Sequence, residues 1–404
     1  MKKVALINQY PLIPSSGARE NIYHNMADIF TRLGMHVELF SLSKRNGVSK
    51  FFGYKQNELK AYTPQQSGFS LPRLIDFLCL GLFGFRPGIE IMNKSNKLIA
   101  ALNAYNPDVI IIADEMLAKM MRRYREKKKP TTKIISGNSD AFSISATFGA
   151  IDNIATSKFR AFTIKYIKKF LENKYFKYQS SLYQIQIDVS DIFITNADVA
   201  QREVLRKFPD ARGKIFTISP FYIKKKIYKK NRYLNQIRNI LFLGSCTHGP
   251  NAIAVNHITK EIAPKLQDKK FFIHGKGWPE KVSGNVYFSG RSVPFKKIFA
   301  NIDLCLSPLT TDSIAIKTKI FDYLVADKII IGTKSSFIGY NITNRFNAII
   351  EDDIRNYYKR IRELEANTSL MRTLQKNIPK GLEGHYEEDV LNGWINVLKY
   401  AKVI

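Results

Sequence analysis

Cysteine, tryptophan and histidine are scarce in this chain of 404 residues, which contains three, two and six of them. The cysteines, Cys79, Cys246 and Cys305, are odd in number and widely spaced, a pattern that excludes a disulfide framework and a cysteine zinc site. Apolar runs long enough to span a bilayer are also lacking, because the longest, Leu71 to Phe85, is short and carries two charges. The first apolar run, VALINQY, has only the length of a strand, so no leader peptide is expected. These features favour a globular protein of a reducing cytoplasm.

Acidic residues are outnumbered, with 34 against 63 lysines and arginines, which gives a net charge of +29. Such an excess favours anionic partners, namely nucleic acid, phosphorylated small molecules or an acidic membrane surface. The basic residues are scattered through apolar segments such as YIKKFLENKYFKYQ and form no polar tail, so nucleic acid is not expected. The basic surface and the Leu71 to Phe85 segment predict peripheral attachment to the anionic inner face of the cell membrane, although that segment fits a buried or partner-facing helix equally well.

Strands and helices alternate in the first half of the chain. Apolar patterns predict a strand at Val4 to Tyr10, a helix ended by Gly34, and a second strand, HVELFSL. This is a βαβ unit, and it requires parallel strands. Further strands are expected in DVIIIAD, TKIISGN and DIFITNA.

The same alternation restarts after a lysine-rich break, FYIKKKIYKKNRYLNQ. The chain is therefore predicted to be α/β, with two Rossmann-like doubly wound domains that face each other across a cleft. The expected boundaries are 1–220 for the first domain, 221–237 for the linker, 238–384 for the second domain, and 385–404 for a final amphipathic helix that packs back on the first domain.

Glycines follow two expected strands of the second domain, at the end where open α/β sheets bind ligands. GSCTHGPN, from Gly244 to Asn251, brackets a strand-to-helix turn, and HGKGWP carries Gly275 and Gly277 after the next strand. Neither segment has the Walker or the dinucleotide-binding pattern. An ordinary tight turn fits the GSCTHGPN segment better than a ligand-binding loop does. His274 fits a packed histidine better than a catalytic one.

A third segment, SIAIKTKIFDYLVADKIIIGT, begins at Ser313 and places Lys317 and Lys319 in the first turn of an expected helix. Lysines there oppose the helix dipole at a cost of about 0.3–1 kcal/mol each, which a bound phosphate would offset. A helical wheel assigns Ile320, Phe321, Leu324 and Val325 to the buried face, with Lys319 and Asp322 together on the other side. A solvent-exposed ion pair is the alternative explanation.

Taken in order, these segments resemble the donor domain of GT-B glycosyltransferases, in particular the retaining family 4-like enzymes of bacterial surface-polysaccharide synthesis. The quoted motifs are the glycine turn with Asn251, HGKG, FSGRSV, LSPL and the lysine-rich helix. In the first half, SSGARENIYHNMADIFTRLGMHVELFS resembles the glycine loop, helix and second strand of that family. The chain departs from it in having Asp322 where a glutamate is usual and Ile314 in place of the preceding acid.

The resemblance implies a hexosyltransferase that uses a UDP- or GDP-sugar and needs neither cofactor nor metal. Lys319 would contact the diphosphate and Asp322 the ribose, and the acceptor would be a glycan or a lipid-linked molecule. The expected donor-binding residues are Gly244, Ser245, Asn251, Gly275, Gly277, Arg291, Ser313, Lys317, Lys319 and Asp322. The first domain would hold the acceptor and the second the donor.

On the acceptor side, Gly17 would give room and Arg19 would offer charge. Asp140 is the best carboxylate to assist the acceptor hydroxyl, although a capping role fits it equally well. It would act with Lys319 as a catalytic residue, and its competitors are Asp114, Glu115 and His24. A retaining reaction would let the leaving-group oxygens take the proton, whereas an inverting one would need one of these acids.

Two other functions fit the same fold. A non-hydrolysing sugar-nucleotide epimerase needs several acids and histidines that converge on one site, and six histidines argue mildly against it. A non-catalytic GT-B protein that binds partners or nucleic acid is the other alternative.

Overall fold

The computed structural model describes most of the chain and divides it into two compact units. In residues 18–21, 55–58, 89–95, 127, 295 and 296 it describes the backbone alone. The described residues are 1–8, 18–41, 55–58, 89–113, 117–127, 131–137, 177–178, 180–224, 234, 236–246, 248–290, 295–310 and 314–404. The predicted segment from Leu71 to Phe85 lies outside these ranges.

The first unit is built on a seven-stranded sheet of order β3-β2-β1-β4-β5-β6-β7, in which every pair is parallel. The central strands are buried along almost their whole length, as expected where helices cover both faces of a parallel sheet. The strands are β1 (Lys3–Asn8), β2 (His36–Ser41), β3 (Lys55–Glu58), β4 (Val109–Ile112), β5 (Lys133–Gly137), β6 (Ile192–Thr195) and β7 (Ile215–Thr217).

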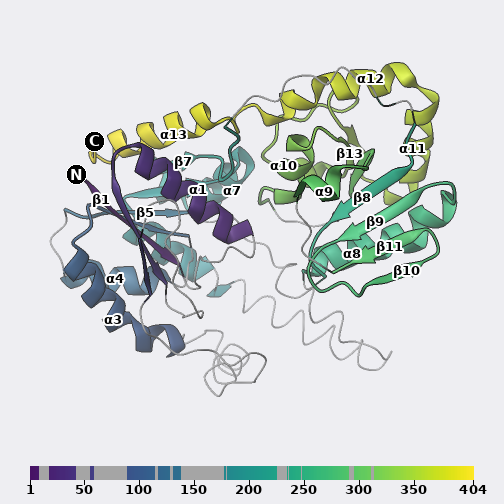
Figure 1. Cartoon of the computed structure of the whole chain (residues 1–404). Helices are drawn as coiled ribbons and strands as arrows, with labels where there is room; N and C mark the ends of the chain where they lie inside the picture. Colours follow the sequence, from purple (N-terminus) through teal and green to yellow (C-terminus); the bar gives the residue numbers. More distant parts are fainter. Residues whose placement is uncertain are drawn as a thin grey trace. The chain divides into compact units, whose positions relative to one another are not determined.

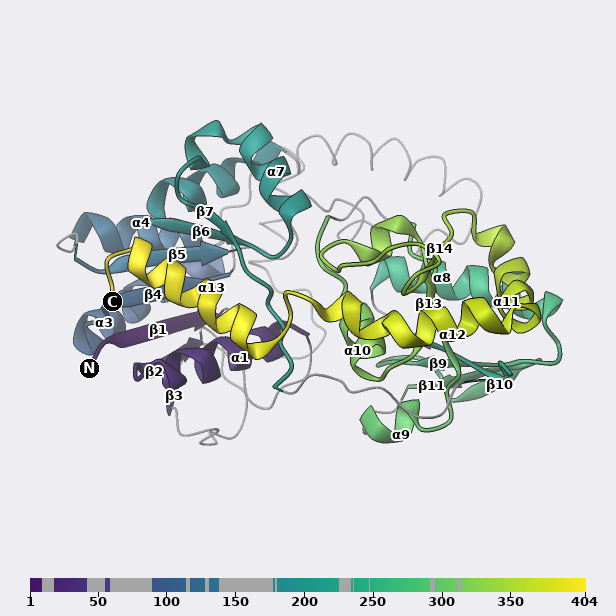
Figure 2. The same cartoon turned by 90° about the horizontal axis from the view of Figure 1, so that it is seen from above.

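Helices cover both faces of this sheet. They are α1 (Ala18–Arg32), α3 (Ile89–Tyr105), α4 (Ala118–Lys127), α7 (Asp198–Lys207) and α13 (Glu387–Tyr400). The last of them comes from the C-terminus, and in Figures 1 and 2 its yellow ribbon runs beside the purple α1. The rings of Phe30 on α1 and Trp394 on α13 meet edge to face with centroids 4.9 Å apart. The unit therefore has a core drawn from both ends of the sequence.

The chain passes from the first unit to the second between Tyr222 and Ile223, and returns between Glu387 and Glu388. The second unit has a sheet of order β10-β11-β9-β8-β12-β13-β14, parallel except for the pair of β10 and β11. Its strands are β8 (Asn239–Leu243), β9 (Lys270–His274), β10 (Lys281–Ser283), β11 (Val286–Ser289), β12 (Leu304–Ser307), β13 (Ile329–Gly332) and β14 (Ile349–Ile350).

The helices of the second unit are α8 (Gly249–His257), α9 (Phe295–Phe299), α10 (Thr318–Val325), α11 (Tyr357–Ala366) and α12 (Thr368–Asn377). Short 3-10 and π-helical segments, labelled η, link several of these elements. Continuous apolar strands such as IIIG of β13 form one core with the inner faces of the helices. Both units thus have the alternating strand–helix architecture predicted from the sequence, which confirms the α/β, Rossmann-like fold class.

Candidate functional site

The turn after β8 is held in shape by contacts that leave no room for side chains. A Cβ atom on Gly244 would lie 2.5 Å from the Asn251 side chain, and one on Gly275 would lie 2.1 Å from the Gly244 carbonyl oxygen. The Trp278 indole donates a hydrogen bond to that same carbonyl, at 2.6 Å. The glycines at the ends of β8 and β9 therefore pack main chain against main chain, which is the reason for their position in the sequence.

Asn251 lies in the first turn of α8 and is buried. Its amide nitrogen donates to the carbonyl oxygen of Ser245, at 3.0 Å. The Ser245 hydroxyl in turn donates to the carbonyl oxygen of Lys276, at 3.0 Å. These bonds fix the Asn251 side chain so that its Oδ1 atom is presented to α10.

The Lys319 side chain meets that oxygen. Its ammonium donates to Asn251 Oδ1 at 2.7 Å and lies 3.9 Å from the centroid of the Phe242 ring. Lys319 is only 9% exposed. The buried face of α10 consists of Lys319, Ile320, Tyr323 and Leu324. The helical-wheel prediction that placed Lys319 on the opposite side is wrong, since the lysine stem packs inward beside Phe242 on β8.

Burial holds the pKa of the Lys319 ammonium well below its usual range, and the nearby charge of Lys317 lowers that pKa further. In the described part of the chain no carboxylate pairs with Lys319, and Asn251 is its one hydrogen-bond acceptor. A buried cation without a counter-ion is costly. The site is therefore ready to accept an anion.

The first turn of α10 adds to this electropositive environment. Its N-cap, Lys317, makes no capping hydrogen bond with its side chain, and the turn contains no acidic residue. Lys317 instead donates from Nζ to the carbonyl of Ala315, at 2.6 Å, and its own carbonyl accepts from the Tyr340 hydroxyl, at 2.9 Å. Free backbone N–H groups at a helix start bind anions well.

Asp322 lies one turn further along α10 and is partly buried. Burial raises the pKa of its carboxyl group to about 7. Within the described residues it forms no ion pair with Lys319, whose ammonium donates to Asn251 instead. Asp322 is a carboxyl group whose charge is poorly solvated, and a hydroxyl donor would stabilise the ionised form.

Sequence reasoning missed three aromatic contributions to this site. Phe242 supplies the ring against Lys319, and Trp278 binds the Gly244 carbonyl. The Tyr323 hydroxyl accepts from the backbone N–H of Leu243, at 2.8 Å, and so ties α10 to β8. The sequence could have indicated these three aromatic residues. Phe242 and Trp278 lie next to turns, and Tyr323 lies on the apolar stripe of α10.

Gly277 lies between Lys276 and Trp278, which both bond to the turn after β8, and its φ of 89° is in the left-handed region that favours glycine. Several other predicted residues cannot be placed with this cluster. His24 lies on α1 of the first unit and is partly buried. The residues outside the described ranges are Gly17, Asp114, Glu115, Asp140, Arg291 and Ser313, and of Arg19 only the backbone is described.

Within the described ranges no helix has both the length and the apolarity needed to cross a bilayer. In those same residues no group of three or more His, Cys, Asp or Glu side chains comes close enough to hold a metal ion.

Solved structures with a similar course of the backbone are glycosyltransferases. The sucrose-phosphate synthase of Thermosynechococcus elongatus superposes with a TM-score of 0.64 at 11% identity, over 100% of this chain and 99% of that one. The chain has the GT-B fold. TarM of S. aureus gives a TM-score of 0.66 at 11% identity over 98% and 99% of the two chains. HepE of Anabaena gives 0.60 at 10% identity over 100% of both. No protein-family profile matches the sequence, and no curated protein matches it significantly.

Proposed function

We propose that this protein is a glycosyltransferase that moves a hexosyl group from a nucleotide-diphosphate sugar to a glycan or lipid-linked acceptor. The observation that carries the proposal is the buried Lys319 ammonium, which belongs to the first turn of α10 and has an amide oxygen as its sole hydrogen-bond partner among the described residues. A diphosphate supplies the negative charge that this arrangement lacks.

The titles of similar structures agree with a nucleotide-sugar donor. HepE was crystallised in complex with UDP-glucose, and a TarM variant with fondaparinux, alpha-GlcNAc-glycerol and UDP. By analogy, the donor-binding residues of this chain are those of the second unit, with Lys319 and Lys317 on the diphosphate and Asp322 on the ribose hydroxyls. Gly244, Ser245, Asn251, Gly275 and Gly277 would shape the wall of the site.

The chemistry follows from charge. When the glycosyl bond breaks, negative charge builds on the diphosphate, and a fixed cation in a site of low polarity stabilises that charge. Lys319 is held in place by Asn251 and Phe242, so it needs no reorganisation during the step. The role is electrostatic and needs no metal. Retention of configuration, Asp140 as the acid that assists the acceptor, and a site of action at the inner membrane face are further parts of this proposal.

A thermal-shift panel tests the proposal directly. The full chain is heated with UDP, GDP, ADP and their hexose conjugates, because a ligand that binds only the native state raises the melting temperature by mass action. We expect one pyrimidine or guanine diphosphate to raise it, and the corresponding sugar nucleotide to be consumed when acceptor glycans are added. A folded protein that no nucleotide stabilises would rule the proposal out.

A further inference from the structure

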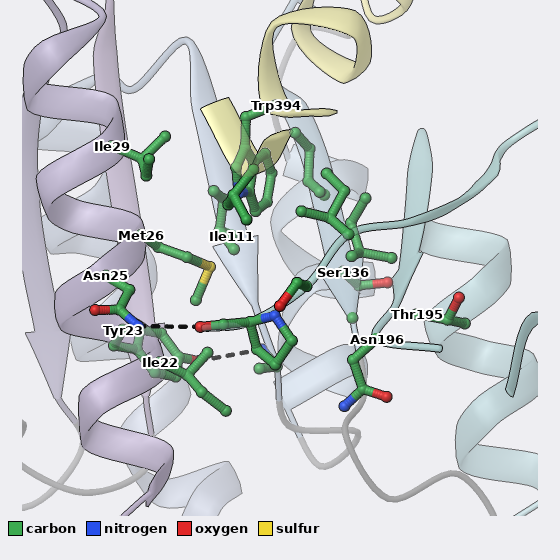
Figure 3. A pocket seen from close by; sticks show the side chains of 18 of the residues that line it. Ile22, Tyr23, Asn25, Met26, Ile29, Ile111, Ser136, Thr195, Asn196 and Trp394 are labelled. Atoms are coloured by element: carbon green, nitrogen blue, oxygen red, sulfur yellow. Dashed lines mark hydrogen bonds between the residues drawn. The ribbon is translucent and has the colours of Figure 1, made fainter. Parts of the chain in front are cut away.

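The first unit contains a cavity of about 80 Å³ at the carboxyl ends of β4, β5 and β6, covered by α1 and α13. Figure 3 shows Met26 and Ile29 of α1 near Trp394 of α13, with Ile111 of β4 between them. The carboxyl edge of a parallel sheet is where open α/β folds bind ligands. This cavity is therefore placed as a binding site, and the predicted acceptor-side residues Gly17, Arg19 and Asp140 have side chains outside the described part of the chain.

Most polar side chains at the cavity already have partners inside the unit. The Tyr23 hydroxyl donates to the Ile7 carbonyl, at 2.6 Å, and accepts from the backbone N–H of Ala113, at 3.1 Å. Asn25 donates to the carbonyl of Pro220, at 3.1 Å, as the dashed line in Figure 3 shows. The Ser136 hydroxyl is bonded to another serine of the unit, at 2.6 Å.

A sugar ring carries hydroxyl groups on most of its carbons, and each would lose its bonds to water on entering this space. With most of the described polar lining engaged, Asn196 Oδ1 being the exception, few replacements are on offer, and unmet hydrogen bonds are costly. A hydrocarbon group has no such requirement. The apolar side chains of Met26, Ile29, Ile111, Ile135 and Trp394 offer it van der Waals contact on several sides.

The size of the cavity limits the group. An engineered apolar cavity of about 150 Å³ binds benzene, and this one is about 80 Å³. In proportion to the six carbons of benzene, it suits a short alkyl branch of about three carbons, and not a complete lipid chain. We propose that the cavity binds the hydrocarbon part of the acceptor molecule and so selects amphiphilic acceptors over free sugars. This inference rests on the proposed function.

Trp394 makes the site observable, since its ring lines the cavity and the chain has two tryptophans in all. The probe is 1-bromopropane, whose bromine quenches indole fluorescence on contact. Ala113→Leu adds a branched side chain at the cavity wall and fills part of it. The matched control is Ala100→Leu, on the exposed side of α3. Circular dichroism spectra and thermal melts verify that both variants are folded.

We expect saturable quenching in the native chain and in Ala100→Leu, with an apparent affinity at least fivefold weaker in Ala113→Leu. Propyl glucoside should displace the probe from the native chain, whereas glucose should not. Equal quenching in Ala113→Leu, or displacement by glucose as efficient as by the glycoside, would overturn the proposal. The glycoside competition needs no variant, so it decides the matter even if Ala113→Leu does not fold.

The experiments distinguish failure of the cavity proposal from failure of the transferase proposal. Quenching that behaves as expected in a protein that binds no nucleotide would leave the cavity assignment standing without the transferase assignment. UDP binding that depends on Lys319 in a protein without saturable quenching would overturn the cavity assignment alone.

Discussion

Replacing Lys319 by methionine separates a ligand-binding lysine from a structural one. Methionine has a similar length and keeps an apolar stem against Phe242, so the variant removes the charge and little else. The native ammonium is buried and has one amide oxygen as partner. The loss of that buried charge and the loss of the bond to Asn251 act on stability in opposite directions.

The magnitude follows from electrostatics. At an effective dielectric constant of about 20, unit charges about 4 Å apart attract by roughly 4 kcal/mol. Hydrogen bonds to charged groups contribute about 1.5–3 kcal/mol net. Taking about 2–4 kcal/mol for the contact with a diphosphate, Lys319→Met should bind UDP roughly 30- to 1,000-fold more weakly. An orphaned Asn251 oxygen costs about 1–3 kcal/mol, and removal of a desolvated charge offsets much of it, so the free energy of unfolding should change by less than about 2 kcal/mol.

Calorimetric titration measures the affinity for UDP, and denaturant unfolding measures the free energy of unfolding. Lys328→Met is the matched control, since the Lys328 ammonium donates to the Ile302 carbonyl at 2.6 Å in the same unit. It should retain native affinity for UDP. If a folded Lys319→Met bound UDP within threefold of the native chain, the assignment of Lys319 to the diphosphate would be refuted.

Three further predictions concern the same unit. Asn251→Asp places a carboxylate against Lys319, so we expect at least tenfold weaker UDP binding in a folded protein, measured by calorimetry. Gly275→Ala drives a Cβ atom into the Gly244 carbonyl, so unfolding in urea should show a loss of about 1–3 kcal/mol, and unchanged stability would contradict the packing described. The folded state raises the pKa of Asp322 to about 7, so it retains a proton that the unfolded chain releases near pH 4. Stability therefore falls as pH rises from about 4 to 7, and Asp322→Asn should remove roughly 1–4 kcal/mol of that fall in urea melts at pH 5 and 8, while parallel curves for the two proteins would disprove it.

The sequence was sufficient to predict the architecture because apolar strand runs and turn glycines, the two signals for it, are both local. Runs such as VALIN and IIIG read as buried parallel strands, and glycines after them mark the turns into helices. The strand β3, with the sequence KQNE, was not predicted, since a polar edge strand has no apolar pattern to reveal it. The antiparallel β10 was missed for the same reason, with all three of its residues exposed.

The sequence was less informative about the direction of the Lys319 side chain. A helical wheel ranks the faces of a helix by hydrophobicity, and on that basis a lysine is assigned to the solvent-exposed face. In the structure the apolar stem of Lys319 packs beside Phe242 and only its tip reaches Asn251, which is an arrangement decided by two residues about seventy positions away. Long-range pairings of this kind carry no periodic signal.

The return of the chain to the first unit after Glu387 makes that unit discontinuous in sequence, while residues 223–387 supply every described element of the second unit. A chain shortened to this segment would lose both termini without the loss of any described strand of the second sheet. Truncation before α13 would have the opposite effect on the remainder, because Trp394 and its neighbours would be stripped from the packing around Phe30. Exchange of the second unit between proteins of this fold can therefore leave both chain ends with the host.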